Sequence, residues 1–468
     1  MSPPPSGPSP ASGPAPEPGW KVLLALLSLA LTALLWFEGL AGSVEQPSVS
    51  NDLTLHQLEL AALVEGRLSE PLAGLLLGDD PRRKLATALE TRISSASPPA
   101  PISQRLELAL LNRGSSENQA DPALSTLVQM VEAARRPLLE ALVDGQRRPP
   151  EQQQALLLPW KPGLLLAQLS CEQLGGPEQS CPANRLAPWL LLRLLGVELL
   201  PALLLLLGIA LLIRELWLLW KGRLAAHPPL VGPPLSLVDT TLLIAGGFVL
   251  VGEVLLPELL QRPLQLVLQR LSPNAAIAHG LQVVVLYAGL SLVPLLVLVR
   301  LLPRQQSPAE GWLQWRWRPF LQTLRQALTM LLLVLPPVAL CGWLIDAVWR
   351  DPGGSNPMLD LVLTGSDPIA LACFALTAIV LAPLFEETLF RGVLLPVLGR
   401  RLGVFTAVLL SAALFAAAHL SLSEFLPLFV LGCGLGWLRL RSGRLGASVL
   451  MHALWNGLTF ANLLLLAG

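Results

Sequence analysis

The sequence predicts an all-α protein, a polytopic membrane helix bundle of about eight or nine spans with an N-terminal helical extramembrane domain. Hydrophobic residues make up 53% of the 468 residues and charged residues only 14%, a composition typical of a chain with many membrane segments. Long leucine-rich runs recur after residue 186, whereas residues 43–186 are more polar and helically periodic. The 32 basic and 32 acidic residues cancel, so net charge does not indicate a nucleic-acid partner.

The chain opens with a segment that we expect to be disordered. Residues 1–19 are rich in Pro, Ser, Gly and Ala and cannot form a core. Residues 20–42 follow as a predicted signal-anchor transmembrane helix, whose apolar run suits either a signal peptide or a span. The flank Glu38–Ser43 resembles a weak cleavage site, but we favour an uncleaved anchor.

Residues 43–186 are predicted to form a helical domain outside the membrane. Leu53–Val64 and Leu124–Ala134 have helical spacing, and Pro-rich breaks separate short helices. Cys171 and Cys181 bracket a Gly/Pro loop, so a disulfide between them is expected if the domain faces an oxidising compartment. The domain shows no catalytic constellation, and substrate selection and partner binding both stay open as its role.

Eight apolar runs after residue 186 are predicted to be membrane spans, which makes nine with the anchor. Those within residues 187–366 have no assigned role, and their isolated polar residues (Glu198, Glu253, His279, Tyr287 and Asp346) are expected to serve helix packing or to lie at headgroup level. The predicted spans are Leu194–Ile213, Thr240–Leu256, Ala276–Val299, Phe320–Ala347, Ile369–Leu398, Val404–His419, Phe425–Leu438 and Leu445–Leu466.

Basic residues gather in alternate loops and predict the orientation of the chain. By the positive-inside rule these loops are cytoplasmic, which places residues 43–186 and the C-terminus on the opposite side. The signal-anchor style and the lack of an organelle-type presequence favour the plasma membrane, or another internal membrane, of a bacterium. The basic residues are Arg214, Lys221, Arg223, Arg304, Arg316, Arg318, Arg400, Arg401, Arg439, Arg441 and Arg444.

Two adjacent glutamates and an arginine interrupt the predicted span Ile369–Leu398. Glu387 and Arg391 are four residues apart, so they can pair on one helix face. Glu386 points about 100° away and has no local cation, so another helix or water must satisfy its carboxylate. Taken alone, the pattern also fits a structural ion pair.

Two further polar features lie on the spans that follow. His419 ends a helix rich in small residues, which allow close helix approach; alone, it also fits a helix cap. His452 and Asn456 lie one turn apart and also fit helix–helix hydrogen bonding. Together with the glutamates, one imidazole and a carboxylate can form a general base on water. The second imidazole and the carboxamide can then stabilise an oxyanion.

These motifs resemble the CAAX protease and bacteriocin-processing family, also called CPBP or Abi. Its members are intramembrane glutamic endopeptidases related to the Ras-converting enzyme. The resemblance covers roughly residues 367–460, so residues 367–468 are expected to be an intramembrane protease core. The motifs are, in order, Glu386-Glu387-x-x-x-Arg391, Phe415-x-x-x-His419 and His452-x-x-x-Asn456.

The resemblance implies an endopeptidase that hydrolyses peptide or prenylated-protein substrates within membrane lipid, without a nucleic-acid partner. Zinc stays possible through Glu386, His419 and His452 with water as fourth ligand. We favour a metal-free site because no His-Glu-x-x-His pair places two ligands on one helix. The implied roles are water activation by Glu386 and His419, a supporting ion pair of Glu387 and Arg391, and an oxyanion hole of His452 and Asn456.

Two other functions fit the same residues. The chain can be a non-catalytic membrane scaffold or immunity factor of the same fold, or a transporter that uses the polar cavity.

The protease site also has a geometric requirement. Glu386 and His419 lie roughly 20 Å and roughly 25 Å from the turn between their helices, so the first helix must continue through Leu398 despite Pro396.

Overall fold

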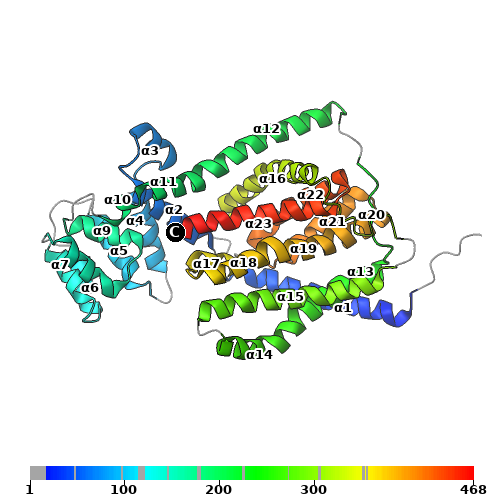
Figure 1. Ribbon diagram of the computed structural model, residues 1–468, viewed down its shortest axis with the longest axis horizontal. Coiled ribbons are helices and arrows are strands. Elements are labelled where there is room, and N and C mark those ends of the chain that lie inside the picture. Colours follow the sequence, from blue (N-terminus) through cyan, green and yellow to red (C-terminus); the bar gives the residue numbers. More distant parts are fainter. Residues whose placement is uncertain are drawn as a thin grey trace, which may run out of the picture. The chain divides into compact units, whose positions relative to one another are not determined.

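The computed structural model describes residues 17–46, 49–95, 99–113, 122–144, 147–175, 181–223, 227–271, 274–303, 307–349, 354 and 357–467. These residues form helices and connections without any β-strand (Figure 1), which confirms the all-α prediction. Most of the tail that we expected to be disordered, residues 1–16, lies outside the described residues. The chain divides into two compact units, and the division falls within α12 (Leu200–Trp220) and α23 (Leu445–Ala467).

Eight helices among the described residues are long and apolar enough to cross a bilayer, so the chain is an integral membrane protein. The predicted span Val404–His419 is not among these eight helices, because the helix formed there is shorter than predicted. Helix α21 (Val404–Ala417) has 14 residues and therefore a length of about 21 Å. The eight helices are Gly19–Ser43, Ala187–Trp220, Leu237–Leu271, Ala275–Leu301, Phe320–Val348, Pro368–Leu402, Leu422–Ser442 and Leu445–Ala467.

One unit comprises residues 1–46, 211–354 and 365–457 and holds most of the membrane helices. Besides parts of α12 and α23, and α21, its elements are α1 (Gly19–Ser43), α13 (Leu237–Thr241), η4 (Leu242–Leu255), α14 (Leu256–Leu271), α15 (Ala275–Leu301), α16 (Phe320–Val348), α18 (Pro368–Ala375), η5 (Leu376–Leu381), α19 (Ala382–Glu387), η6 (Thr388–Leu394), α20 (Leu395–Leu402) and α22 (Leu422–Ser442).

The span from α18 to α20 alternates between α-helix and π-helix. Asp367 begins it by accepting hydrogen bonds from the backbone N–H groups of Ile369 and Ala370. Pro383 and Pro396 each remove one backbone donor, yet the helix continues through both to Leu402. The required continuity past Pro396 is therefore present. The π-helical segments η5 and η6 flank α19, and such segments are frequent at functional sites.

Aromatic and leucine side chains bury the second half of this span within its unit. Phe385, Leu389 and Phe390 are each at most 2% exposed. The Phe390 ring meets the Phe415 ring edge-on at 5.4 Å, which joins η6 to α21. Ser411 of α21 also donates a hydrogen bond to the Phe390 carbonyl. The glutamates of α19 are thus fixed to a closely packed frame rather than to a loop.

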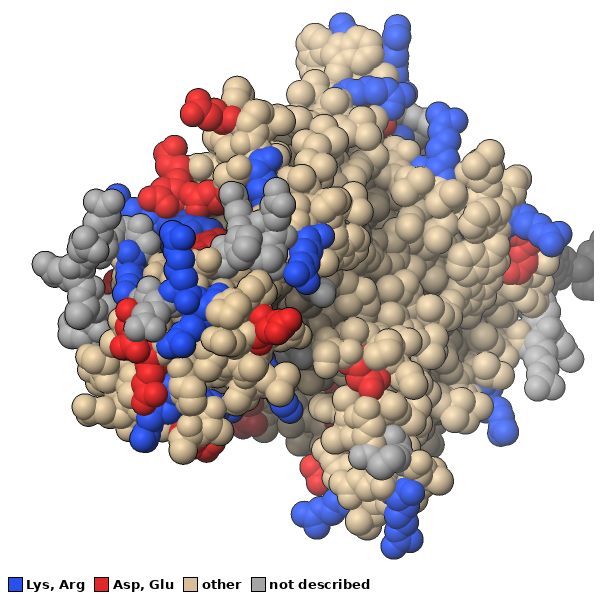
Figure 2. Space-filling model, turned by 60° about the vertical axis from the view of Figure 1, so that its left-hand side comes forward, with Lys and Arg blue, Asp and Glu red and all other residues tan. Residues whose placement is uncertain are grey.

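The other unit comprises residues 47–210, 355–364 and 458–468. Charged side chains gather over its short helices, whereas broad uncharged areas cover the long helices (Figure 2). Its elements are α2 (Val49–Val64), α3 (Glu70–Leu76), α4 (Pro81–Ser95), α5 (Ile102–Arg113), α6 (Pro122–Met130), α7 (Arg136–Asp144), α8 (Pro150–Leu157), η1 (Leu158–Trp160), α9 (Leu164–Gln173), α10 (Pro182–Arg185), α11 (Ala187–Leu194), η3 (Leu195–Leu199), and α17 (Pro357–Thr364).

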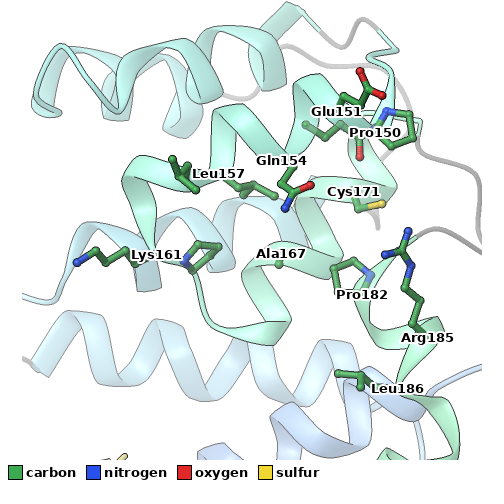
Figure 3. A pocket seen from close by; sticks show the side chains of 13 residues that line it. Pro150, Glu151, Gln154, Leu157, Lys161, Ala167, Cys171, Pro182, Arg185 and Leu186 are labelled. Atoms are coloured by element: carbon green, nitrogen blue, oxygen red, sulfur yellow. The ribbon is translucent and has the colours of Figure 1, made fainter.

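Leucine packing and one covalent link stabilise this unit. Leu85, Leu106 and Leu138 of α4, α5 and α7 are fully buried. Cys171 and Cys181 form a disulfide, as the sequence predicted for an oxidising compartment. A cavity of about 770 Å³ lies beside Cys171, and Figure 3 shows its lining side chains.

A pair of half-buried carboxyl groups gives the same unit a pH-dependent stability. Burial raises the pKa of Glu107 on α5 to about 8, and the nearby Glu59 carboxyl adds to the effect. Burial also raises the pKa of Glu59, against the opposing influence of His56 and Arg92. An unfolded glutamate has a pKa of about 4.3, so the folded state binds more protons between that pH and about pH 8. Stability is therefore greatest below this window and falls as the pH rises through it.

We expect hydrogen exchange of the α2 and α5 amides in the full-length protein to show this loss. After correction for intrinsic exchange, the opening free energy should fall between pH 6 and pH 9 in wild type and stay nearly level in Glu107→Gln. Glu90→Gln on α4, whose side chain is exposed, serves as the control and should keep the wild-type slope. The same slope in all three proteins would contradict the assignment to Glu107.

Candidate active site

A buried ion pair lies at the midpoint of the span Pro368–Leu402. Glu387 and Arg391 are both 0% exposed, and Arg391 Nη1 donates to Glu387 Oε1 at 2.9 Å. The pairing predicted from their four-residue separation is therefore present. Two opposite charges at this depth stabilise each other, because neither has water to solvate it.

The Arg391 guanidinium is held by two more groups. Its Nη2 donates to the Gly432 carbonyl of α22 at 3.0 Å, and its centre lies 4.4 Å from the Phe415 ring centroid, a cation–π distance. A Cβ at Gly432 would lie 3.0 Å from Ala412 of α21, so the glycine lets these helices approach. The small side chains of Gly432 and Ala412 thus allow the Gly432 carbonyl to lie within hydrogen-bond distance of the buried Arg391.

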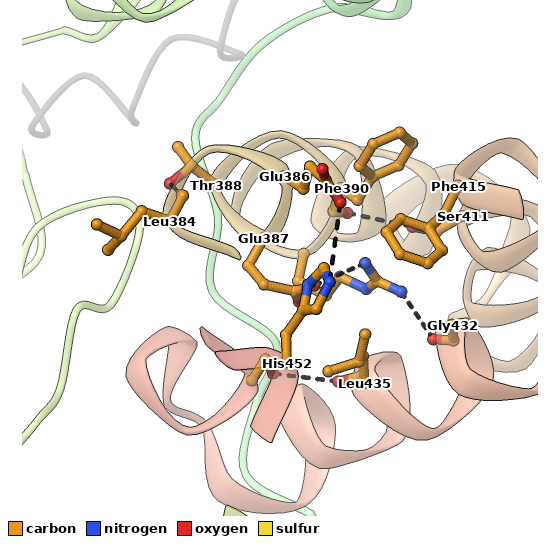
Figure 4. Close-up of polar contacts among 12 residues, drawn as sticks. Leu384, Glu386, Glu387, Thr388, Phe390, Ser411, Phe415, Gly432, Leu435 and His452 are labelled. Atoms are coloured by element: carbon orange, nitrogen blue, oxygen red, sulfur yellow. Dashed lines mark hydrogen bonds and ion pairs between the residues drawn. The ribbon is translucent and has the colours of Figure 1, made fainter. Parts of the chain in front are cut away.

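His452 of α23 lies between the two glutamates, as Figure 4 shows. Its Nδ1 is 3.0 Å from Glu387 Oε1. An ionised carboxylate only accepts hydrogen bonds, so Nδ1 carries the proton of this contact. The other ring nitrogen, Nε2, lies 3.9 Å from Glu386 Oε2. Glu387 therefore fixes the imidazole so that Nε2 faces Glu386.

Glu386 has one oxygen held and one oxygen free. Tyr287 of α15 donates its hydroxyl to Glu386 Oε1 at 3.0 Å. Glu386 Oε2 is buried and has no hydrogen-bond partner among the described residues. A buried carboxylate oxygen normally has a partner, so this oxygen and His452 Nε2 leave a position suited to a water molecule or a substrate group.

Two residues that the sequence assigned to packing belong to this cluster. Tyr287 contacts Glu386 directly, and Glu253 of η4 lies close enough to interact electrostatically with both Glu386 and Tyr287. Their isolated positions on other spans gave no motif. One signal was available in the sequence: Tyr287 is the only tyrosine in the chain, and it lies within a predicted span.

His419 lies just beyond the end of α21, beside the same aromatic ring. Its Nδ1 is 2.8 Å from the Phe415 carbonyl, which can only accept, so Nδ1 is the donor. The Phe415 ring contacts His419 at 4.8 Å and His452 at 5.7 Å between centroids. The Phe415 ring therefore contacts both imidazoles. The Nε2 atom of His419 is available to a substrate or a water molecule.

Asn456 lies one turn beyond His452 on α23. Its side-chain nitrogen donates to the Ala378 carbonyl of η5 at 2.7 Å, which ties α23 to the span that carries the glutamates. The nitrogen has a second hydrogen. Of the six predicted site residues, the structure joins Glu386, Glu387, Arg391 and His452 by direct contacts. His419 shares the Phe415 ring with His452, and Asn456 is bonded to Ala378 on the span that carries the glutamates.

The zinc alternative would use Glu386, His419 and His452 as ligands. No group of three His, Cys, Asp or Glu side chains within the described part of the chain is placed to hold one metal ion. The choice between a metal-free and a zinc site stays a prediction, and no step of the proposed chemistry is assigned to a metal. The carboxylate and the two imidazoles suit proton transfer, and the carboxamide can donate a hydrogen bond.

Two parts of the chain match different family models. Residues 50–192 match a family model described as "Domain of unknown function (DUF8675)". The chain is also 42% identical over 82 residues to an "Uncharacterized 24.3 kDa protein" of Escherichia coli. That alignment covers 16% of this chain and 38% of the relative. No solved structure matches the chain.

The second matched region includes the cluster of polar residues just described. Residues 368–458 match the model described as "Type II CAAX prenyl endopeptidase Rce1-like". This match includes all three motifs on which the resemblance rested, and it confirms that resemblance. Residues 368–458 of this integral membrane protein are therefore similar to the type II CAAX prenyl endopeptidase Rce1-like family.

Proposed function

We propose that this protein is an intramembrane endopeptidase of the glutamic type, in which Glu386 activates water for attack on a peptide bond. The observation that carries the proposal is the pair of unequal environments at the Glu386 carboxylate. Oε1 is held by Tyr287, whereas the buried Oε2 has no hydrogen-bond partner among the described residues and lies 3.9 Å from His452 Nε2. A fixed carboxylate with one available oxygen is suited to act as a general base.

The reaction uses water as the nucleophile. The water oxygen attacks the peptide carbonyl carbon while one of its protons passes to Glu386, with Nε2 of His419 as the second group that orients the water. The tetrahedral intermediate then breaks its carbon–nitrogen bond, and Glu386 returns the proton to the leaving amine. The products are a new carboxyl terminus and a new amino terminus.

The oxyanion of the intermediate is assigned to His452 and Asn456. The Asn456 amide has one hydrogen beyond the one it donates to Ala378. His452 can donate from Nε2 when that atom carries a proton in addition to Nδ1. Glu387 and Arg391 position His452, because the ion pair fixes the carboxylate oxygen on which Nδ1 rests. Such prearranged donors are the most effective means of stabilising developing charge.

The proposed substrates are peptides or prenylated proteins in the membrane. The decisive experiment is cleavage by purified wild-type protein in phosphatidylcholine vesicles, with a panel of prenylated and unprenylated membrane peptides and mass spectrometry of the products. Activity that survives 1,10-phenanthroline is expected. Activity lost to the chelator and restored by zinc would support the metal-dependent alternative, and no cleavage of any member would favour a scaffold.

Tyr287→Phe tests the residue that the sequence did not assign to the site. This change removes only the hydroxyl that holds Glu386 Oε1. A hydrogen bond to a charged group contributes about 1.5–3 kcal/mol, so kcat should fall about tenfold or more while KM changes little. Exposed Phe320→Tyr on α16 adds a phenol elsewhere and should leave kcat unchanged. Equal kcat for Tyr287→Phe and wild type would remove Tyr287 from the positioning of Glu386.

A further inference from the structure

A second polar cavity lies in the same unit but away from the glutamates. It has a volume of about 590 Å³ and is formed where α12, α16 and α22 reach one end of their spans. Arg214, Arg325 and Arg441 line it, together with one carboxylate, Glu215. We call this cavity the arginine groove, and none of the residues of the protease motifs lines it.

The arginine groove carries uncompensated positive charge. Glu215 lies 2.9 Å from Arg441 and 3.5 Å from Arg214, so the one carboxylate is shared by two guanidinium groups. Arg325 is exposed and has no hydrogen-bond or ion-pair partner in the part of the chain that the structure describes. Three arginines and one glutamate leave two positive charges, which favour an anionic occupant.

The lining changes from polar to apolar along each helix. On α16 the groove begins at Gln322 and Arg325 and continues to the buried side chains of Met330 and Leu333. On α22 the buried Leu438 precedes Arg441 in the same way. An occupant must therefore present an anionic head to one end of the groove and a hydrocarbon chain to the other.

The polar end of the groove lies at a membrane–water boundary. Trp217 and Trp220 are exposed on the last turn of α12, beyond Arg214, and tryptophan is enriched at this level of a bilayer. Two of the groove arginines, Arg214 and Arg441, belong to the basic set that the positive-inside rule places in the cytoplasm. Phospholipid headgroups lie at this level, and the cytoplasmic leaflet is the anionic one.

We propose that the arginine groove binds one anionic phospholipid of the phosphatidylglycerol type, with its phosphate on Arg325 and Arg214 and an acyl chain along Met330 and Leu333. Gln326 Oε1 lines the groove as a buried acceptor with no partner among the described residues. A glycerol headgroup has hydroxyls that can donate to it, whereas a phosphatidylcholine headgroup has no donor and no net charge to balance the arginines.

Native mass spectrometry of the delipidated full-length protein in neutral detergent tests this assignment. The protein is titrated with phosphatidylglycerol, with phosphatidylcholine of the same chains, and with glycerol phosphate. One phosphatidylglycerol is expected to bind at least about fivefold more tightly than phosphatidylcholine. Each interfacial arginine contributes about 1 kcal/mol, which corresponds to about fivefold in affinity. Arg325→Gln should therefore lower the phosphatidylglycerol affinity about fivefold and leave phosphatidylcholine unchanged.

Arg401→Gln is the matched control, because Arg401 is exposed, belongs to the same basic set and lies outside the groove. It should keep the wild-type preference. Equal affinity for the two lipids, or the same loss in Arg401→Gln as in Arg325→Gln, would overturn the proposal. Binding of glycerol phosphate as tight as that of phosphatidylglycerol would show a soluble-anion site and would overturn the lipid assignment.

Discussion

Glu386→Gln is expected to lower peptide cleavage about 10²–10⁴-fold, the usual contribution of a general acid–base group. The amide keeps the size of the side chain and still accepts the Tyr287 hydroxyl through its oxygen. It cannot take a proton from water, so the loss should fall on kcat rather than on KM. The measurement is single-turnover cleavage of whichever membrane peptide the wild type processes in vesicles.

A control for this variant is available on another membrane helix. Glu258 of α14 is exposed, so Glu258→Gln removes a carboxylate without touching the site and should cleave at the wild-type rate. The Glu386→Gln protein should also elute as a folded species in detergent, because the replaced side chain is not part of the buried ion pair. Cleavage by Glu386→Gln within about twofold of wild type would rule out the proposed mechanism.

Arg391→Met is expected to cause the largest loss of stability, about 3–5 kcal/mol, because it leaves Glu387 buried without a counter-charge. Removing both charges in Glu387→Gln/Arg391→Met should restore part of that loss, since no lone charge then stays in the core. Unfolding free energies from a dodecyl sulfate titration in mixed micelles would measure both. Exposed Arg401→Gln should behave as wild type.

The comparison between single and double variants separates charge pairing from packing. If Arg391 mattered only through its contacts with Phe415 and the Gly432 carbonyl, the double variant would be at least as unstable as the single one. A double variant more stable than Arg391→Met is the signature of the pair. Neither protein should cleave peptides well, because both lose the Glu387–Arg391 ion pair that positions His452.

Apolar runs with sharp polar limits predicted the membrane helices closely. The predicted span Phe320–Ala347 corresponds to the observed helix Phe320–Val348, and the predicted span Ala276–Val299 corresponds to the helix Ala275–Leu301. The boundaries agree because a capping residue or a proline precedes each helix. The predicted Thr240–Leu256 was too short, because the helix continues through polar α14 to Leu271. The hydropathy of the sequence shows where the apolar side chains end. In this helix the backbone hydrogen bonds continue beyond that point.

The site shows the same division between local and long-range information. The Glu387–Arg391 pair follows from helical spacing within one segment. The contact between Tyr287 and Glu386 joins residues 99 positions apart, and it depends on how two helices pack. One sequence contains no record of that packing. The roles of His419 and Asn456 likewise depend on where a substrate lies and stay predictions.

Tyr287 reaches the glutamate from a helix outside the matched residues 368–458. A fragment trimmed to those residues would keep every motif and still lack the phenol that restrains the base. A truncated protein that is meant to keep peptidase activity should therefore begin no later than Ala275, so that it includes α15 and the Tyr287 hydroxyl that holds Glu386.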